Sequence, residues 1–262
     1  MVQPPATDAW QPAQYNRFAA ERRQPFDELV ALCQSVNGGV IHDLGCGTGA
    51  LTATLARRLD ARLVIGSDSS ASMLAEATAH TSPVVRFELG DLAAFDPTEP
   101  PDLVFSNAAL QWVDDHPAVL AHWRTRLAPG GQIAVQVPTN GDHPAYRLAA
   151  RLGNELSDWF PDGPPGLAPD TVAVPEVYAQ VLHDLGAVEQ HVALRVFTHL
   201  LDSTPAVTEW IKGTSLNRFR VALGDERFAE FERAYTERLV AELGDQQPYL
   251  FTFKRILMWA RF

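Results

Sequence analysis

Short apolar runs alternate with helical patterns along this chain, and that alternation constrains its fold more than any other feature. The runs lie at 40–44, 63–65, 84–89, 102–106 and 133–137. Between the first two runs, leucines recur at every fourth position, which is typical of a helix. Strands separated by helices pair in parallel, because right-handed crossovers return each strand to the same sheet. We therefore predict an α/β fold with a doubly wound, mostly parallel sheet.

A glycine-rich loop follows the first run. Asp43 lies two residues before Gly45, and Cys46, Gly47 and Gly49 carry the chain toward the next helix. Such a loop admits a nucleotide-type cofactor, but its G-x-G-x-x-A pattern fits a dinucleotide and S-adenosylmethionine alike. The Asp43 carboxylate would repel a pyrophosphate and attract the ammonium and sulfonium groups of S-adenosylmethionine. The charge favours the methyl donor, and a helix cap or a salt bridge is the alternative role of Asp43.

Acidic residues also follow the second and third runs. Asp68 lies 19 residues after the glycine loop ends, where an acid can accept both ribose hydroxyls. Its alternative role is to cap the helix that opens at Ser69. Asp91 is placed to read the adenine amino group, and Leu92 or Met73 to cover the adenine ring.

The fourth run leads into a polar and aromatic patch, S-N-A-A-L-Q-W, at 106–112. Because the carboxyl ends of parallel strands meet at one edge of a sheet, this patch is expected beside the glycine loop. Asn107 is placed to line the donor site. Trp112 is placed to form a pocket wall, with simple packing in the core as its alternative role.

The second half of the chain departs from the alternating rhythm. Residues 141–175 are rich in proline and glycine and predict a helix and loop excursion. Runs at 188–201 and 249–261 predict two more strands, which makes seven in the sheet. Between them, helical patterns around 206–212 and 227–243 predict two helices. We predict a single domain over 1–262, with two domains as the alternative. Its expected parts are an N-terminal lid at 1–26, a cofactor-binding half at 27–138, and helical cap elements at 139–187 and 202–247.

Composition disfavours several classes of protein. The 262 residues suffice for a full core, and the net charge of −11 disfavours nucleic acid as a partner. The chain lacks a long uncharged apolar stretch and a secretory signal, so we expect a cytoplasmic protein away from membranes. Cys33 and Cys46 are the two cysteines, and no two histidines have H-x-x-x-H spacing, so we expect free thiols and no metal. We also expect a monomer or a weak homo-oligomer.

Taken in this order, the motifs resemble those of the class I S-adenosylmethionine-dependent methyltransferases. They are D-L-G-C-G-T-G at 43–49, G-S-D-S-S at 66–70, G-D-L at 90–92 and S-N-A-A-L-Q-W at 106–112. More narrowly, W-Q-P at 10–12, A-V-Q-V-P at 134–138 and W-I-K-G at 210–213 resemble the trans-aconitate 2-methyltransferase family. Two departures are Thr48 and Ala50 in the glycine loop, and G-D-Q-Q-P at 244–248 in place of a Pro-Pro-Arg stretch.

The resemblance implies a Rossmann-like fold, S-adenosylmethionine as cofactor and a small-molecule carboxylate, best matched by trans-aconitate, as methyl acceptor. An ionised carboxylate needs no general base, so no catalytic residue and no metal are assigned. The expected cofactor-binding residues are Trp10, Tyr15, Asp43, Gly45, Cys46, Gly47, Gly49, Asp68, Ser69, Met73, Asp91, Leu92 and Asn107. The expected substrate-binding residues are Arg17, Arg22, Trp112, His116, Arg218 and Arg255.

Other functions stay open at this point. Within the methyltransferases, the acceptor is alternatively another small acid, a carrier-bound acid or a natural product. An NAD-dependent oxidoreductase would share the glycine loop, although Asp43 argues against a pyrophosphate there. A cofactor-binding regulator without catalysis is a further alternative.

Overall fold

The computed structural model describes residues 19–165, 171–213 and 215–262, and it confirms the predicted sheet. Seven strands lie in the order β3-β2-β1-β4-β5-β7-β6. All strand pairs among β1, β2, β3, β4 and β5 are parallel, and β7 is antiparallel to β5. The strands are β1 (Val40–Leu44), β2 (Leu63–Asp68), β3 (Val85–Leu89), β4 (Leu103–Asn107), β5 (Gln132–Pro138), β6 (Glu189–Leu201) and β7 (Tyr249–Arg261).

The described chain divides into two compact units. The sheet unit contains 19–138, 171–195 and 254–262, and the helical unit contains 139–165 and 196–253. Strands β6 and β7 therefore each have one part in either unit. The α-helices of the sheet unit are α2 (Ala19–Leu32), α3 (Thr52–Arg58), α4 (Ala71–Ala77), α5 (His116–Arg126) and α7 (Pro175–Asp184). Short 3-10 helices are η1 (Thr78–His80), η2 (Leu92–Ala94) and η3 (Leu110–Trp112).

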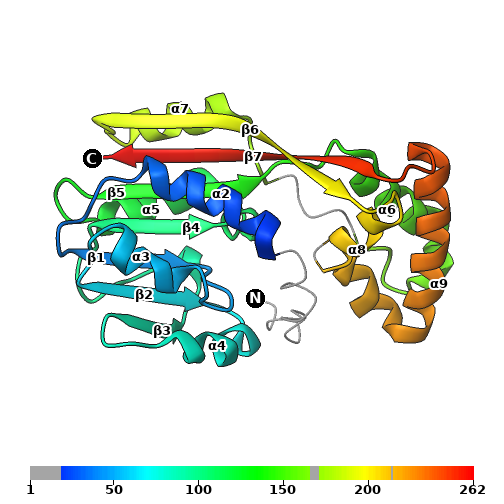
Figure 1. Cartoon of the computed structure of the whole chain (residues 1–262), viewed down its shortest axis with the longest axis horizontal. Helices are drawn as coiled ribbons and strands as arrows, with labels where there is room; N and C mark the ends of the chain where they lie inside the picture. The colour runs from blue at the N-terminus through cyan, green and yellow to red at the C-terminus, as the bar shows by residue number, and fades with distance from the viewer. Residues whose placement is uncertain (1–18, 166–170, 214) are drawn as a thin grey trace. The chain divides into compact units, whose positions relative to one another are not determined.

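Helices cover both faces of the sheet in the sheet unit (Figure 1). On one face, Val104, Ile133 and Val135 pack in a single core cluster with Trp123 of α5. On the other face α2 packs on β5, and Phe26 meets Phe105 of β4 edge to face with ring centroids 5.4 Å apart. Burial on both sides explains the nearly continuous apolar runs of these strands. It also leaves the edge at the carboxyl ends of β1 to β5 as the place for polar side chains.

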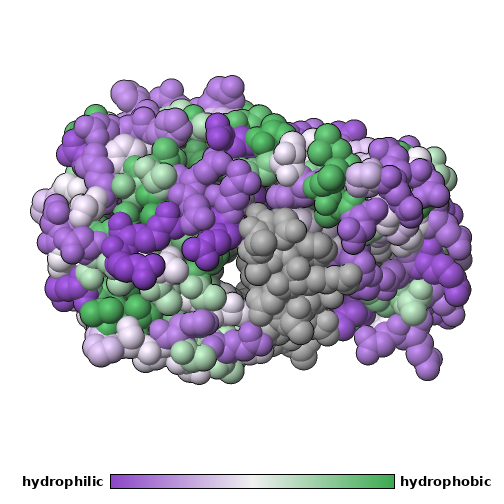
Figure 2. Space-filling view, in the orientation of Figure 1, coloured by the Kyte–Doolittle hydropathy of each residue, from purple (hydrophilic) through white to green (hydrophobic). Residues whose placement is uncertain are grey.

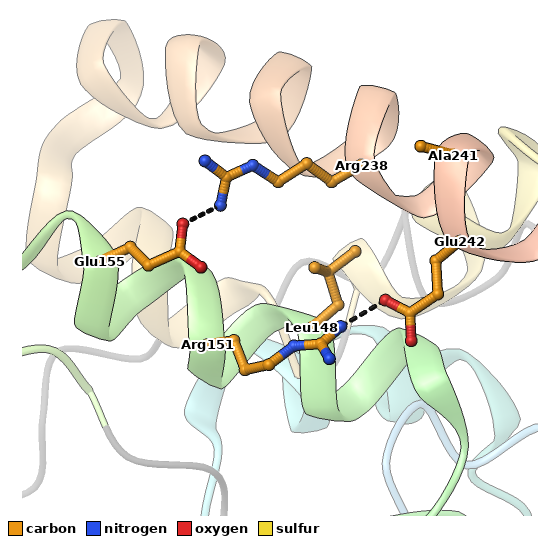
Figure 3. Close-up of a pocket in the computed structure, with 6 residues that line it drawn as sticks. All are labelled: Leu148, Arg151, Glu155, Arg238, Ala241 and Glu242. Atoms are coloured by element: carbon orange, nitrogen blue, oxygen red, sulfur yellow. Dashed lines mark hydrogen bonds and ion pairs between the residues drawn. The ribbon is translucent and has the colours of Figure 1, made fainter.

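The helical unit contains α6 (Pro144–Glu155), η4 (Ser157–Trp159), α8 (Ala206–Lys212) and α9 (Asn217–Leu243). Phe219 and Phe231 stack in its core with centroids 4.8 Å apart, and the Tyr235 hydroxyl donates to the Ala145 carbonyl oxygen at 2.7 Å. Two ion pairs, Arg151 with Glu242 and Arg238 with Glu155, join α6 to α9 along a groove of about 410 Å³ (Figure 3). Because each arginine faces a carboxylate, the groove is balanced in charge.

Two boundaries differ from those expected. Residues 171–187, assigned to the cap by the sequence, are part of the sheet unit, because Tyr178 and Leu182 of α7 are buried in its core cluster. Helix α9 begins at Asn217 rather than at 227, and Gly224 interrupts it with a φ of 71°. The excursion at 141–175 contains α6, which begins at Pro144 after the His143 side chain accepts the Ala145 N–H.

The surface in view is mostly hydrophilic (Figure 2). Within the described residues, no helix is long and apolar enough to cross a membrane. In the same part of the chain, no group of three or more histidine, cysteine and acidic side chains could hold a metal ion.

Candidate active site

The glycine loop lies between β1 and α3 at the carboxyl edge of the sheet. The N–H groups of Gly45 and Cys46 both donate to the Ser67 carbonyl oxygen, at 2.8 and 3.0 Å. A Cβ on Gly45 would lie 2.1 Å from that of Ala109, so this glycine is required for close packing. A Cβ on Gly47 would meet nothing within 4 Å. The loop is therefore fixed at its start and leaves space beside Gly47 for a ligand.

Asp43 is a buried carboxyl at the end of β1, with 4% of its surface exposed. The Thr52 hydroxyl donates to Asp43 Oδ2 at 2.6 Å, and no described residue forms an ion pair with it. Burial raises the pKa of Asp43 to about 7, the Thr52 hydrogen bond lowers it, and nearby Asp68 raises it further. The residue at the N-cap of α3 is Leu51, so the alternative roles of Asp43 as cap or salt-bridge partner are wrong. A cationic ligand would favour ionisation of this carboxyl.

Asp68 ends β2 and connects it to the glycine loop. Its two carboxylate oxygens accept the N–H groups of Gly47 at 2.8 Å and Ser70 at 2.9 Å. Ser70 itself caps α4 by accepting the Met73 N–H, so the alternative role of Asp68 as the cap is wrong. The role of Asp68 toward the ribose hydroxyls stays a prediction.

Four further residues expected to bind the cofactor lie just after β3 or at the start of α4. Asp91 is exposed and accepts the Ala93 N–H at 2.9 Å as the cap of η2. Leu92 is half-buried, Met73 is buried and Ser69 is exposed. The expected contacts of these four residues with the cofactor stay predictions.

Asn107 ends β4 beside the glycine loop. Its Oδ1 atom is buried and has no hydrogen-bond partner among the described residues. Buried side-chain oxygens are normally hydrogen-bonded, so this atom marks a position where a donor belongs. The ammonium group of S-adenosylmethionine is such a donor.

Cys46 of the glycine loop carries a half-buried thiol. Burial and the charges of Asp43 and Asp68 raise the pKa of Cys46, so this thiol stays protonated at neutral pH. Burial likewise raises the pKa of Cys33 to about 12. Both cysteines are free, as expected.

The expected acceptor residues whose side chains are described belong to several elements of the two units. Trp112 is 42% exposed, so its alternative role as part of the core is wrong. His116 is 1% exposed and shares a hydrogen bond of 2.6 Å with the Tyr178 hydroxyl, and burial lowers its pKa. The ring is packed against α7, and its role toward an acceptor stays a prediction. Arg218 lies half-buried in α9 of the helical unit, where burial lowers its pKa.

Arg255 lies in the sheet unit and is buried in β7 opposite Pro138. Its Nη1 donates to Oε1 of Gln136 at 2.9 Å, a residue that was not among the predicted site residues. Arg22 lies in α2, but its side chain is outside the described part of the chain. Trp10, Tyr15 and Arg17 also lie outside the described residues.

Comparison with known proteins gives the family. A model of a methyltransferase domain matches residues 41–131. Trans-aconitate 2-methyltransferase of Deinococcus radiodurans is 39% identical over 254 residues, which are 96% of this chain and 97% of that protein. The chain belongs to the trans-aconitate 2-methyltransferase family. The enzyme of the same name from Streptomyces avermitilis is 35% identical over 267 residues, with 97% of both chains covered.

Solved structures agree with the fold of this trans-aconitate 2-methyltransferase family member. The YcgJ protein of Bacillus subtilis matches with a TM-score of 0.57 at 12% identity, over 91% of this chain and 98% of that chain. Phosphoethanolamine N-methyltransferase 2 of Haemonchus contortus, in complex with S-adenosyl-L-methionine, matches with a TM-score of 0.56 at 15% identity. That match covers 92% of this chain and 52% of the other. The predicted Rossmann-like class I methyltransferase fold is confirmed.

Proposed function

We propose that this protein is an S-adenosylmethionine-dependent methyltransferase that esterifies a carboxylate of trans-aconitate. The observation that carries the cofactor assignment is Asp43, a buried carboxyl at the glycine loop without an ion-pair partner among the described residues. A pyrophosphate beside this carboxyl would add like charge, which argues against a dinucleotide. The acceptor assignment rests on relatives of at least 35% identity over nearly the whole chain.

Three side chains at the sheet edge fit the cofactor. Asp43 offers negative charge to the ammonium and sulfonium groups, and Asn107 Oδ1 offers an acceptor to the ammonium. Asp68 lies at the same edge, where it accepts two backbone N–H groups, and a carboxylate is a suitable acceptor for ribose hydroxyls. S-adenosylmethionine supplies a methyl group that its sulfonium charge already activates.

The protein's part in the reaction is to bind and to orient. The acceptor carboxylate is ionised at neutral pH, so no side chain has to remove a proton from it. Holding two reactants in line supplies a large share of a rate enhancement by itself. This agrees with the protonated thiol of Cys46.

One sequence feature favours an acceptor other than trans-aconitate. G-D-Q-Q-P at 244–248 stands where a Pro-Pro-Arg stretch would add a positive charge. An acid with fewer carboxylates than trans-aconitate would need less positive charge in its site. A related small acid is therefore the alternative acceptor.

The deciding experiment is the formation of S-adenosylhomocysteine by the purified full chain, with and without trans-aconitate. We expect turnover that depends on trans-aconitate and a monomethyl ester as product, identified by mass spectrometry. Donor binding without such turnover would overturn the acceptor, and a panel of mono-, di- and tricarboxylic acids would then identify the alternative. Failure to bind the donor would overturn the whole proposal.

A further inference from the structure

Gln136 is a buried polar side chain that the sequence did not assign to the site. It interrupts the apolar strand β5 near its carboxyl end, and its exposed fraction is 0%. Its Nε2 atom is buried and has no hydrogen-bond partner among the described residues. Buried amide groups are almost always paired, because an unpaired donor loses its hydration without compensation. The amide of Gln136 therefore offers two N–H groups that await an acceptor.

Arg255 fixes which way this amide points. A guanidinium only donates hydrogen bonds, so the atom of Gln136 that meets Arg255 Nη1 at 2.9 Å must be the oxygen, Oε1. The amide cannot flip without placing donor against donor. Nε2 is therefore held away from Arg255, and the group that it binds lies next to a positive charge.

The position of Gln136 places this donor beside the cofactor residues. Gln136 of β5 is the register partner of Asn107 of β4, so both side chains lie on the same face of the sheet at neighbouring strand ends. The Ala108 N–H also donates to the Gln136 carbonyl oxygen at 2.8 Å. A group bound by Gln136 Nε2 would therefore lie next to the group bound by Asn107 Oδ1.

We propose that Gln136 is a specificity-determining residue that binds a carboxylate of the methyl acceptor through its Nε2 hydrogens, with Arg255 orienting its amide. A carboxylate suits this position because it accepts hydrogen bonds and carries the charge opposite to that of Arg255. Methyl transfer requires donor and acceptor side by side, as Asn107 and Gln136 are. The inference rests on the proposed function, because it names how that same site recognises its anion.

The test uses two variants of the full chain. Gln136→Glu keeps an oxygen for Arg255 but replaces the N–H groups with a negative oxygen, and Gln136→Met removes both polar atoms at similar length. We measure binding of trans-aconitate by calorimetry in the presence of S-adenosylhomocysteine, the KM for each substrate, and the melting temperature. Both variants should weaken trans-aconitate binding and raise its KM by about tenfold or more, with Gln136→Glu the worse. The affinity for S-adenosylmethionine should change less than about threefold.

Gln132→Glu is the matched control. Gln132 lies on the same strand and face, and its amide is satisfied by the Gln34 N–H, the Trp259 indole N–H and the Gln34 carbonyl oxygen. We expect this control to lower the melting temperature while leaving trans-aconitate affinity within about twofold, because its amide has a structural role.

The outcomes separate the inference from the proposed function. Turnover of trans-aconitate by the wild type, with unchanged acceptor affinity in both Gln136 variants, would overturn the inference and leave the function intact. A fall in melting temperature alone would also overturn it, since the amide would then serve only the fold. A wild type that binds trans-aconitate without methylating it would refute the function, and the affinities of the variants would still decide the inference. A wild type that methylates another acid but does not bind trans-aconitate would refute trans-aconitate as the acceptor, and the affinities of the variants for that acid would decide the inference.

Discussion

Replacing Asp43 by asparagine should stabilise this protein above neutral pH while it weakens the cofactor site. Asp43 is buried, and it accepts a hydrogen bond from the Thr52 hydroxyl at 2.6 Å. Asparagine has nearly the same shape and offers Oδ1 to that hydroxyl, but it has no charge to bury. The variant therefore isolates the cost of ionising a carboxyl in this position.

The size of the effect follows from the pKa of Asp43, which burial raises from 3.8 to about 7. Below a pH of about 4 the carboxyl is protonated in the folded and unfolded chains, so Asp43 does not lower the free energy of unfolding by ionisation. As the pH rises from about 4 to about 7, only the unfolded chain ionises, and the wild type loses about 1.4 kcal/mol of stability per pH unit. Above that range the loss is constant at roughly 4 kcal/mol.

The assay is urea unfolding of wild type and Asp43→Asn at pH values of about 5 and about 8. The free energy of unfolding of the variant should exceed that of the wild type at both, by a difference that grows by roughly 3 kcal/mol between them. S-adenosylmethionine affinity of the variant should fall by about tenfold or more, because an ionised partner is lost. Asp96→Asn, a change at an exposed acid, is the control and should show neither effect. A stability difference that does not vary with pH would refute the reasoning.

Three further predictions concern other parts of the chain. Asp68→Ala should weaken S-adenosylmethionine binding by roughly 1.5–3 kcal/mol, measured by calorimetry, and unchanged affinity would contradict the ribose assignment. Gly45→Ala should lower the free energy of urea unfolding by roughly 1–3 kcal/mol more than Gly47→Ala, because only the former Cβ meets Ala109; equal losses would disprove it. Arg151→Ala should lower the free energy of unfolding by less than about 1 kcal/mol, and by less still at high salt, since its ion pair with Glu242 is partly exposed. A larger, salt-independent loss in thermal unfolding would show a role beyond the ion pair.

Much of the fold could be predicted from local sequence. The bounds predicted for β1, α8 and β7 are those of the structure, at 40–44, 206–212 and 249–261. These elements have apolar patterns that end at turn residues, and strands buried on both faces have near-continuous apolar runs. The doubly wound order follows from the alternation, because the handedness of crossovers leaves few other arrangements.

The division into units could not be predicted in the same way. The Tyr178 hydroxyl of α7 shares a hydrogen bond with His116 and accepts the Ala173 N–H, and these contacts tie α7 to the sheet unit. The sequence shows a helix at this place but not the surface that it packs against. The early start of α9 was missed because Gly224 interrupts the helical pattern with a positive φ.

The site shows the same limit at the level of single side chains. The glycine loop and Asp43 could be predicted because their chemistry is contained in a few consecutive residues. Gln132 and Gln136 lie four residues apart in one apolar strand, so their local patterns are alike. What separates them is their partners: Gln132 meets Gln34 and Trp259, whereas Gln136 meets Arg255 with one side of its amide only. Those partners lie 98, 127 and 119 residues away in the chain. A glutamine that completes the fold and one that awaits a ligand therefore differ only once the sheet has brought distant residues together.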